Sequence, residues 1–181
     1  MKLLAILADG SEELEAIAVI DIMRRCGVEV TTAGLEQFSI RGAHGTEITC
    51  ETVLKQCDIS AFDGVFLPGG LNGSLAFYAS AAVQEVLRRM YADGKIVSAI
   101  CAAPIALAKA GILDGKCFTM YPGFEKYLDG KIYTDALAET DGKVVTGKGP
   151  GAVFAFSKQL AAALGAEKEF AAVSTGMFLP L

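Results

Sequence analysis

IVSAICAAP, residues 96–104, places a cysteine between a short apolar run and a proline. The apolar residues before Cys101 predict a β-strand, Lys95–Ile100. Pro104 is suited to the first turn of a helix, where its fixed φ fits and its missing N–H is not needed. We therefore expect a strand, a sharp turn at Cys101 and a helix, Ala103–Ala110. This is one strand–helix unit of a parallel α/β sheet.

The same alternation recurs along the whole chain. Several strands are apolar on both faces, as in a parallel sheet that helices cover on both sides. We expect a single domain, residues 1–181, with a doubly wound α/β sandwich fold and a mostly parallel sheet. The predicted strands are Lys2–Ala8, Glu29–Ala33, Thr46–Cys50, Gly64–Leu67, Lys95–Ile100, Lys116–Met120 and Lys143–Thr146. The predicted helices are Glu12–Cys26, Ala81–Ala92, Ala103–Ala110 and Ala152–Leu164.

Composition and charge exclude several classes of function. The formal net charge is −5 and no Lys/Arg cluster stands out, which argues against a nucleic-acid partner. No apolar stretch approaches the ~20 residues of a membrane span. The apolar run at the N-terminus ends at Asp9 and reads as a first strand rather than a signal peptide. The five cysteines show no CxxC spacing, which favours reduced thiols and a cytoplasmic location.

Cys101 is the strongest candidate for a reactive residue. A cysteine at a strand–helix elbow lies beside the helix N-terminus, whose free N–H groups favour the thiolate and lower the pKa. The alternative is a buried structural cysteine, which is how most free cysteines are used. We assign that structural role to the other four cysteines: Cys26, Cys50, Cys57 and Cys117.

Glu15 is the second candidate. At about 100° per residue it falls on the apolar side of the first helix, among Ala16, Val19 and Ile22. A buried carboxylate needs a partner or a proton. If Glu15 reaches Cys101, the two groups share a proton and titrate as a coupled pair. The alternative is a partly exposed helix glutamate.

The third candidate is Pro68–Gly70, which ends the strand Gly64–Leu67. Glycines let backbone N–H groups approach a ligand closely and stabilise an oxyanion there, although turns use the same residues. The sequence GKGPG at 147–151 is equally compatible with a plain turn. His44 is the only histidine and lies between glycines in a predicted surface loop. Phosphate-binding motifs such as GxxxxGK[ST] are missing from the sequence, so nucleotide binding has little support.

Taken together, ADGSEELEA, IDIMRRCGVEVTTAG, FLPGG, SAICAAP and TGKGPG make the sequence resemble the DJ-one branch of the ThiJ/PfpI superfamily. The resemblance runs essentially from end to end and implies a flavodoxin-like fold. It implies that Cys101 is the reactive cysteine and that Glu15 is a protonated glutamate that hydrogen-bonds it. Gly69, Gly70 and Ala102 match the backbone groups that bind an oxyanion.

The resemblance also implies a homodimer that needs no cofactor and no metal. Arg25 and Pro150 match residues that line the neighbouring pocket across the dimer. Family members are reported to act on reactive oxoaldehydes as glyoxalases, on early glycation adducts as deglycases, as chaperones and as peroxide sensors. Small carbonyl compounds or glycated proteins are then the expected partners. Protease-like members carry a histidine directly after the cysteine; Ala102 stands there, which rejects peptidase activity.

Tyr121, in TMYPGF, departs from the family pattern, which has a histidine before this proline. Tyrosine is a poor proton shuttle near neutral pH because its unperturbed pKa is about 10. The expectation is weak turnover of oxoaldehydes with intact oxidation of Cys101. The enzymatic role and a non-enzymatic role as redox sensor or chaperone use the same two residues, so both hypotheses stay open.

Overall fold

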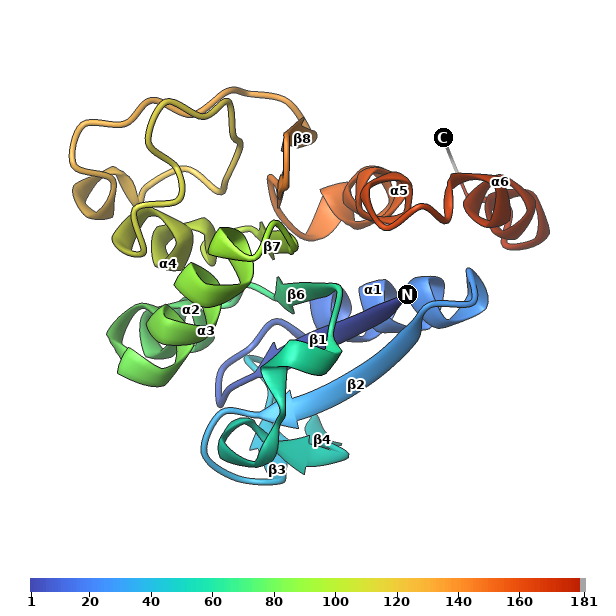
Figure 1. Cartoon of the computed structure of the whole chain (residues 1–181), viewed down its shortest axis with the longest axis horizontal. Coiled ribbons are helices and arrows are strands. Elements are labelled where there is room, and N and C mark those ends of the chain that lie inside the picture. Colours follow the sequence, from blue (N-terminus) through green and yellow to red (C-terminus); the bar gives the residue numbers. More distant parts are fainter. Residues whose placement is uncertain (180–181) are drawn as a thin grey trace.

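The structure is a computed structural model that describes residues 1–179. Its centre is a seven-stranded sheet with the strand order β5-β2-β1-β6-β7-β9-β8 (Figure 1). All neighbouring strands run parallel except β8, which pairs antiparallel with β9 at the edge. The strands are β1 Lys2–Leu7, β2 Glu29–Gly34, β5 Thr52–Val53, β6 Gly64–Leu67, β7 Ile96–Ile100, β8 Ala138–Asp141 and β9 Val144–Gly147.

Helices cover both faces of the sheet. α1, α5 and α6 pack together on one face, and α2, α3 and α4 pack together on the other (Figure 1). The helices are α1 Glu13–Arg25, α2 Leu71–Ala79, α3 Ala81–Ala92, α4 Pro104–Lys109, α5 Val153–Ala163 and α6 Glu167–Gly176. The predicted flavodoxin-like α/β sandwich is therefore confirmed.

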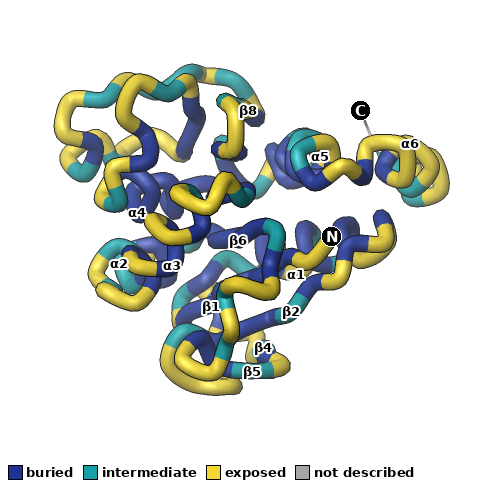
Figure 2. Tube along the Cα trace, viewed as in Figure 1, coloured by how far each residue is buried: buried dark blue, intermediate teal, exposed yellow. Residues whose placement is uncertain are grey.

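The core lies in two layers, one on each side of the sheet. β6, which Figure 2 shows in dark blue, is buried along its whole length, and so are β7 and β9. Burial on both sides explains why these strands are largely apolar on both faces. On the α1 side, Phe66 of β6 packs against Phe156 of α5 with ring centroids 5.6 Å apart. The burial of these strands stabilises the sheet, and the sheet in turn positions the loops that follow its strands.

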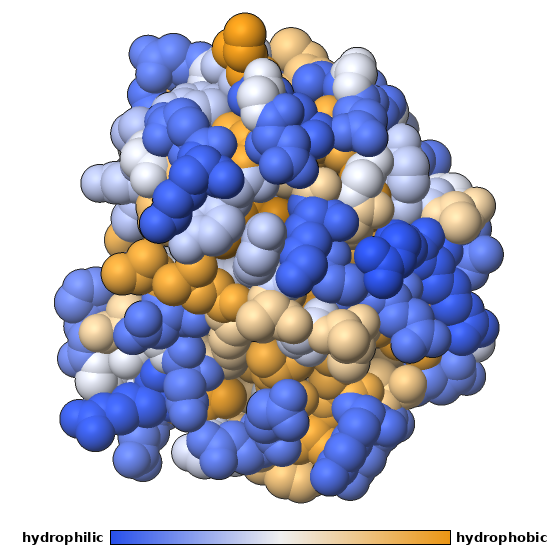
Figure 3. All heavy atoms as spheres, turned by 90° about the vertical axis from the view of Figure 1, so that its left-hand side faces the viewer, coloured by the Kyte–Doolittle hydropathy of each residue, from blue (hydrophilic) through white to orange (hydrophobic). Residues whose placement is uncertain are grey.

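The outer surface of the α2–α4 side is mixed in character. Figure 3 shows this side, where polar residues cover the upper and outer parts and hydrophobic residues form a band across the lower half. Within residues 1–179, no helix combines the length and the apolar character that crossing a bilayer requires.

Two sequence-based strands need correction. Lys116–Met120 forms no strand beyond an isolated bridge between Thr119 and Thr134. Its N–H groups are taken by side chains: Cys117 donates to Asp141 at 3.0 Å and Thr119 to Thr146 at 2.9 Å. No strand ladder can form where side-chain oxygens occupy the donors.

The strand predicted at Thr46–Cys50 exists but belongs to a different sheet. It forms β4, Glu47–Thr49, which pairs antiparallel with β3, Ser39–Arg41, in a separate two-stranded hairpin. Elements that the sequence did not predict are α2, α6, β3, β5 and β8. The prediction of one domain over 1–181 extends two residues beyond the described chain and stays a prediction.

Candidate active site

The carboxyl ends of β1, β6, β7 and β9 meet at one edge of the sheet because these strands run parallel. Ligands of open α/β sheets bind at this edge. The loops that gather there are Ala8–Glu12 after β1, Pro68–Gly70 after β6, Cys101–Ala103 after β7 and Lys148–Gly149 after β9. The topology thus brings together segments that lie far apart in the sequence.

Cys101 adopts a left-handed backbone conformation, with φ at 63°. A non-glycine residue in this region costs roughly 1–2 kcal/mol, so the surroundings must hold it. Two backbone hydrogen bonds do so: the Cys101 N–H donates to the Gly147 carbonyl at 2.8 Å, and the Tyr121 N–H donates to the Cys101 carbonyl at 2.8 Å. Pro104 opens α4 as the sequence predicted. The elbow is therefore real and clamped from both sides.

Glu15 lies in the first turn of α1 and its side chain is fully buried. Its Oε2 accepts a hydrogen bond from the Gly69 N–H at 2.7 Å. Its Oε1 has no well-formed hydrogen bond, and the Cys101 side chain is the other polar group in contact with the carboxyl. The prediction that Glu15 is buried and reaches Cys101 agrees with this geometry.

Gly69 fits between the two side chains because it has none. A Cβ there would lie 2.5 Å from the Cys101 Cβ and 2.5 Å from Glu15 Oε2. Its N–H is directed at Glu15, which differs from the predicted oxyanion role. The N–H groups that face the Cys101 sulfur are those of Gly70 and Ala102. Gly70 has φ at 87°, a conformation that favours glycine.

The two ionisable groups shift each other's pKa. Burial raises the pKa of Glu15 to about 7, although the Gly69 hydrogen bond and the Cys101 thiol act in the opposite direction. Burial and the neighbouring Glu15 carboxylate raise the pKa of the Cys101 thiol to about 12, against the N–H groups of Gly70 and Ala102. The pair therefore carries at most one negative charge near neutral pH.

The pKa of the Cys101 thiol is raised, whereas the sequence-based expectation was a lowered pKa. That expectation considered the helix N-terminus alone, and α4 has only six residues. Burial, which the sequence could not quantify, is the largest effect on the thiol. A proton on Glu15 removes the repulsion between the two anions, so the thiolate is favoured only while Glu15 carries the proton.

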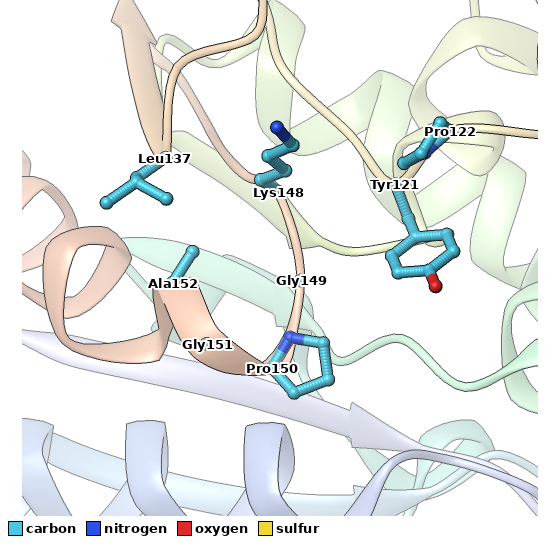
Figure 4. Close-up of a pocket in the computed structure, with 8 residues that line it drawn as sticks. All are labelled: Tyr121, Pro122, Leu137, Lys148, Gly149, Pro150, Gly151 and Ala152. Atoms are coloured by element: carbon cyan, nitrogen blue, oxygen red, sulfur yellow. The ribbon is translucent and has the colours of Figure 1, made fainter.

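Tyr121 and Pro150 line a cavity of about 400 Å³ beside the elbow (Figure 4). The Tyr121 ring is about half exposed and lies close to Gly149, where a Cβ would come within 3.2 Å of the ring. Leu137 and Lys148 form the far wall. Sequence reasoning missed these two wall residues; GKGPG was the one signal, and it points to Lys148 but not to Leu137.

Arg25 and His44 do not lie in the site of this chain. Arg25 ends α1, ten residues or roughly 15 Å from Glu15 along the helix, and bonds Asp21 at 2.7 Å. His44 is exposed, and its Nδ1 lies 3.1 Å from Glu13 and 3.4 Å from Glu12. The role of Arg25 across a dimer stays a prediction.

Among residues 1–179, one group has the composition of a metal site: Glu12, Glu13 and His44, whose ligand atoms lie within 4.8 Å of one another. The imidazole already pairs with both carboxylates; the His44 side chain is exposed, whereas the two glutamate side chains are largely covered.

Comparison with known proteins agrees with the geometry. The model of the DJ-1/PfpI family matches residues 1–163. Protein dj-1beta of Drosophila melanogaster is 37% identical over 179 residues, which cover 97% of this chain and 96% of that protein. Its crystal structure superimposes with a TM-score of 0.93 over 99% of this chain and 98% of that chain.

Two further relatives carry informative names. A deglycase of Pyrococcus abyssi is 30% identical over 161 residues, covering 88% of this chain and 96% of that protein. Toxoplasma gondii DJ-1, solved in an oxidized form, is 27% identical with a TM-score of 0.93 and covers 99% of both chains. A family model that spans most of the sequence and a relative that matches nearly all of it confirm the resemblance: the chain belongs to the DJ-1/PfpI family.

Proposed function

We propose that the protein is a cysteine-dependent, cofactor-independent enzyme that protects against reactive oxoaldehydes and early glycation adducts. One observation carries the proposal: the clamped Cys101 lies against a buried Glu15 whose pKa is raised to about 7. A group with a pKa near the working pH both accepts and donates protons efficiently. Glu15 is therefore suited to activate the thiol and to move protons on the substrate.

In the first step, the Glu15 carboxylate accepts the thiol proton while the Cys101 sulfur adds to the aldehyde carbon, C1. The N–H groups of Gly70 and Ala102, which face the sulfur, stabilise the negative charge that develops beside them. Glu15 then returns the proton to the aldehyde oxygen. The product of this step is a hemithioacetal.

In the second step, Glu15 removes the proton from C1 and delivers a proton to C2, while the proton of the C1 hydroxyl passes to the C2 oxygen. C1 becomes the carbonyl of a thioester and the C2 carbonyl becomes a hydroxyl group. Water cleaves the thioester, which releases an α-hydroxy acid and regenerates the thiol. The sum is oxoaldehyde plus water to hydroxy acid, so the oxidation at C1 is balanced by the reduction at C2 without a cofactor.

The deglycase name of the Pyrococcus abyssi relative supports the second substrate class. An early adduct of an oxoaldehyde with an amine or thiol presents a carbon to which the Cys101 sulfur can add after the adduct opens. The same two side chains then serve both reactions.

A redox role is the alternative, and the Toxoplasma gondii relative, which was solved in an oxidized form, supports this alternative. Peroxide would oxidise Cys101 to sulfenic and then sulfinic acid, with water as the product of each step. A protonated Glu15 would donate a hydrogen bond to the sulfinate oxygen. A chaperone or sensor role would depend on that oxidised form.

The homodimer belongs to the proposal as well. The outward face of α1 exposes Leu14 and Ile17, which are 54% and 46% exposed, on the same helix as Arg25. Packing of this face against a second copy would cover both apolar side chains and bring Arg25 toward the partner. The expected location is the cytoplasm, where the cysteines stay reduced.

The deciding experiment is methylglyoxal turnover by the purified protein, compared with Cys101→Ala and with Cys117→Ala. Cys117 is an exposed cysteine outside the site and serves as the matched control. The proposal expects loss of turnover in Cys101→Ala alone. A wild-type protein that adds two oxygen atoms at Cys101 under peroxide but does not turn over methylglyoxal would favour the redox role instead.

A further inference from the structure

We infer that the hydroxyl group of Thr146 positions Cys101 for reaction. It does so through Thr119, by holding the segment whose backbone keeps Cys101 in its left-handed conformation. The inference rests on the proposed function for the choice of Cys101 as the reacting group. It adds a positioning residue to the site, since Thr146 acts through other residues rather than on the substrate.

The segment Lys116–Tyr121 runs beside the elbow without forming a strand. Two alternate N–H groups near its end hold it in place. The Thr119 N–H donates to the Thr146 hydroxyl oxygen at 2.9 Å, and the Tyr121 N–H donates to the Cys101 carbonyl at 2.8 Å. Because only one residue separates the two donors, the position of the Tyr121 N–H at the elbow depends on where Thr146 holds Thr119.

Thr146 itself is held firmly. It is fully buried on β9, where its register partners are Ala99 of β7 on one side and Glu139 of β8 on the other. The next residue along β9 is Gly147, whose carbonyl accepts the Cys101 N–H at 2.8 Å. Both hydrogen bonds that clamp Cys101 therefore lead back to Thr146, one through the peptide chain and the other through its hydroxyl group.

Loss of the Thr146 hydroxyl would leave the Thr119 N–H without its acceptor. Thr119 is fully buried, and a buried donor without an acceptor is costly, so the segment would shift toward another partner. The Tyr121 N–H would then withdraw from the Cys101 carbonyl. A non-glycine residue keeps a positive φ only where its surroundings hold it, so the elbow would relax and the sulfur would move relative to Glu15.

The main test is Thr146→Val, which replaces the hydroxyl by a methyl group on a side chain of the same shape. Two quantities are measured: kcat/KM for methylglyoxal, and the rate at which peroxide adds oxygen to Cys101, followed by peptide mass mapping. Because a displacement of about 1 Å can slow a reaction about a hundredfold, both should fall by roughly tenfold to a hundredfold. Thr146→Ser keeps the hydroxyl and should restore both values to near those of the wild type.

Thr32→Val is the matched control. Thr32 is a buried threonine of β2, and its hydroxyl oxygen accepts the N–H of Glu51 at 3.0 Å. The lost hydrogen bond is of the same kind, but β1 and β6 separate β2 from the strand that precedes Cys101. Urea midpoints of the two valine variants should fall by similar amounts. Turnover and oxidation of Cys101 should fall in Thr146→Val alone.

Thr119→Val is the second variant, and it decides the case if Thr146→Val does not fold. The Thr119 hydroxyl donates to the Ala136 carbonyl at 2.7 Å, with the Thr134 carbonyl at 3.2 Å. Its removal loosens Thr119 from the other side and leaves β9 unchanged. Both rates should fall in the same direction as in Thr146→Val, and Thr119→Ser should restore them.

The outcomes separate the inference from the proposed function. A folded Thr146→Val whose two rates fall no further than those of Thr32→Val overturns the inference and leaves the proposed function standing. A Thr146→Ser variant as slow as Thr146→Val also overturns it, because the hydroxyl would not be the group that matters. If Thr146→Val does not fold, unchanged rates in Thr119→Val overturn it. Absence of Cys101-dependent turnover in the wild type overturns the proposed function, and the rate of Cys101 oxidation then decides the inference.

Discussion

The outward and inward sides of the first turn of α1 each carry a glutamate, and their surroundings push the two pKa values in opposite directions. Glu15 faces inward, is fully buried and has its pKa raised to about 7 by burial. At Glu13, burial also raises the pKa, but hydrogen bonds from His44 and Thr46 outweigh it and hold the pKa at about 2. Two residues of the same type, two positions apart, are thus a proton-transfer group and a permanent anion.

The difference lies in the donors that each carboxylate meets. Glu13 accepts the N–H groups of His44 at 2.7 Å and Thr46 at 3.3 Å, together with the His44 ring. These donors tie the turn between β3 and β4 to the start of α1. Glu15 accepts one N–H and keeps an oxygen without a partner. A carboxylate that is buried and incompletely satisfied is costly to ionise, which makes it useful for proton transfer.

The largest expected effect is on turnover. Glu15→Gln keeps the size of the side chain but cannot accept and return a proton, so kcat/KM for methylglyoxal should fall by about 10²–10⁴-fold. Glu13→Gln, the matched control on the same turn, should change it by less than about threefold. Steady-state kinetics of both purified variants measure this. Equal losses would mean that the two glutamates do not differ in role.

The next effect is a pH-dependent change in stability at Glu15. Its folded pKa is raised from 4.5 to about 7, so the unfolded chain releases this proton first. The group's contribution is therefore fully favourable below pH 4.5 and is lost as the pH rises to 7, by about 3 kcal/mol. Glu15→Gln should gain that amount relative to the wild type between pH 4 and pH 8.

Urea denaturation at the two pH values tests this expectation. The Glu13→Gln variant should show the opposite sign, because the folded pKa of Glu13 is lowered to about 2. Its contribution is present above pH 4.5 and is lost as the pH falls toward 2. A Glu15→Gln variant whose stability relative to the wild type does not change with pH would show that Glu15 is not buried in solution.

A smaller effect is expected at Gly69, which separates Glu15 from Cys101. Gly69→Ala places a methyl group 2.5 Å from both side chains, and overpacking of this kind costs about 1–3 kcal/mol. Gly151→Ala is the matched control, since a Cβ there meets open space. Thermal or urea unfolding compares the two. Equal stability of both variants would mean that the gap between Glu15 and Cys101 is wider than the structure has it.

Much of the inward side could be predicted from the sequence, because local pattern determines it. The buried strand before Cys101, the proline after it and the apolar neighbours of Glu15 are all visible in short stretches. The raised thiol pKa could not be predicted, because its largest cause is burial, which depends on tertiary packing rather than on local sequence. The outward side was missed for the same reason: the contact of His44 with Glu13 joins residues 31 positions apart.

The cavity wall shows the same limit. Leu137 precedes β8, an edge strand of sequence AETD whose polar residues do not read as a strand. Its position becomes meaningful only once β8 pairs with β9 and the Lys148 N–H reaches its carbonyl. Likewise, Lys116–Met120 has a strand-like composition but forms no ladder, because the N–H groups of Cys117 and Thr119 bond the side chains of Asp141 and Thr146. Contacts with residues distant in sequence, rather than local propensity, decided the structure of both segments.

The smallest expected effect is at His44, and it addresses whether the outward side takes part in the chemistry. The hydrogen bond to Glu13 and the charges of Glu12 and Glu13 raise the pKa of this exposed imidazole. Because the folded pKa is raised, its stabilisation is fully present below the unfolded value of about 6.5 and is lost as the pH rises through the folded value. His44→Ala should therefore be slightly less stable than the wild type at pH 5.5 and indistinguishable from it at pH 9.

Methylglyoxal turnover by His44→Ala should stay within about twofold of the wild-type value, since the ring is held by Glu12 and Glu13 on the surface. A loss of tenfold or more, without a matching loss in Glu13→Gln, would instead place the imidazole in the reaction and join the two sides of the turn into one site.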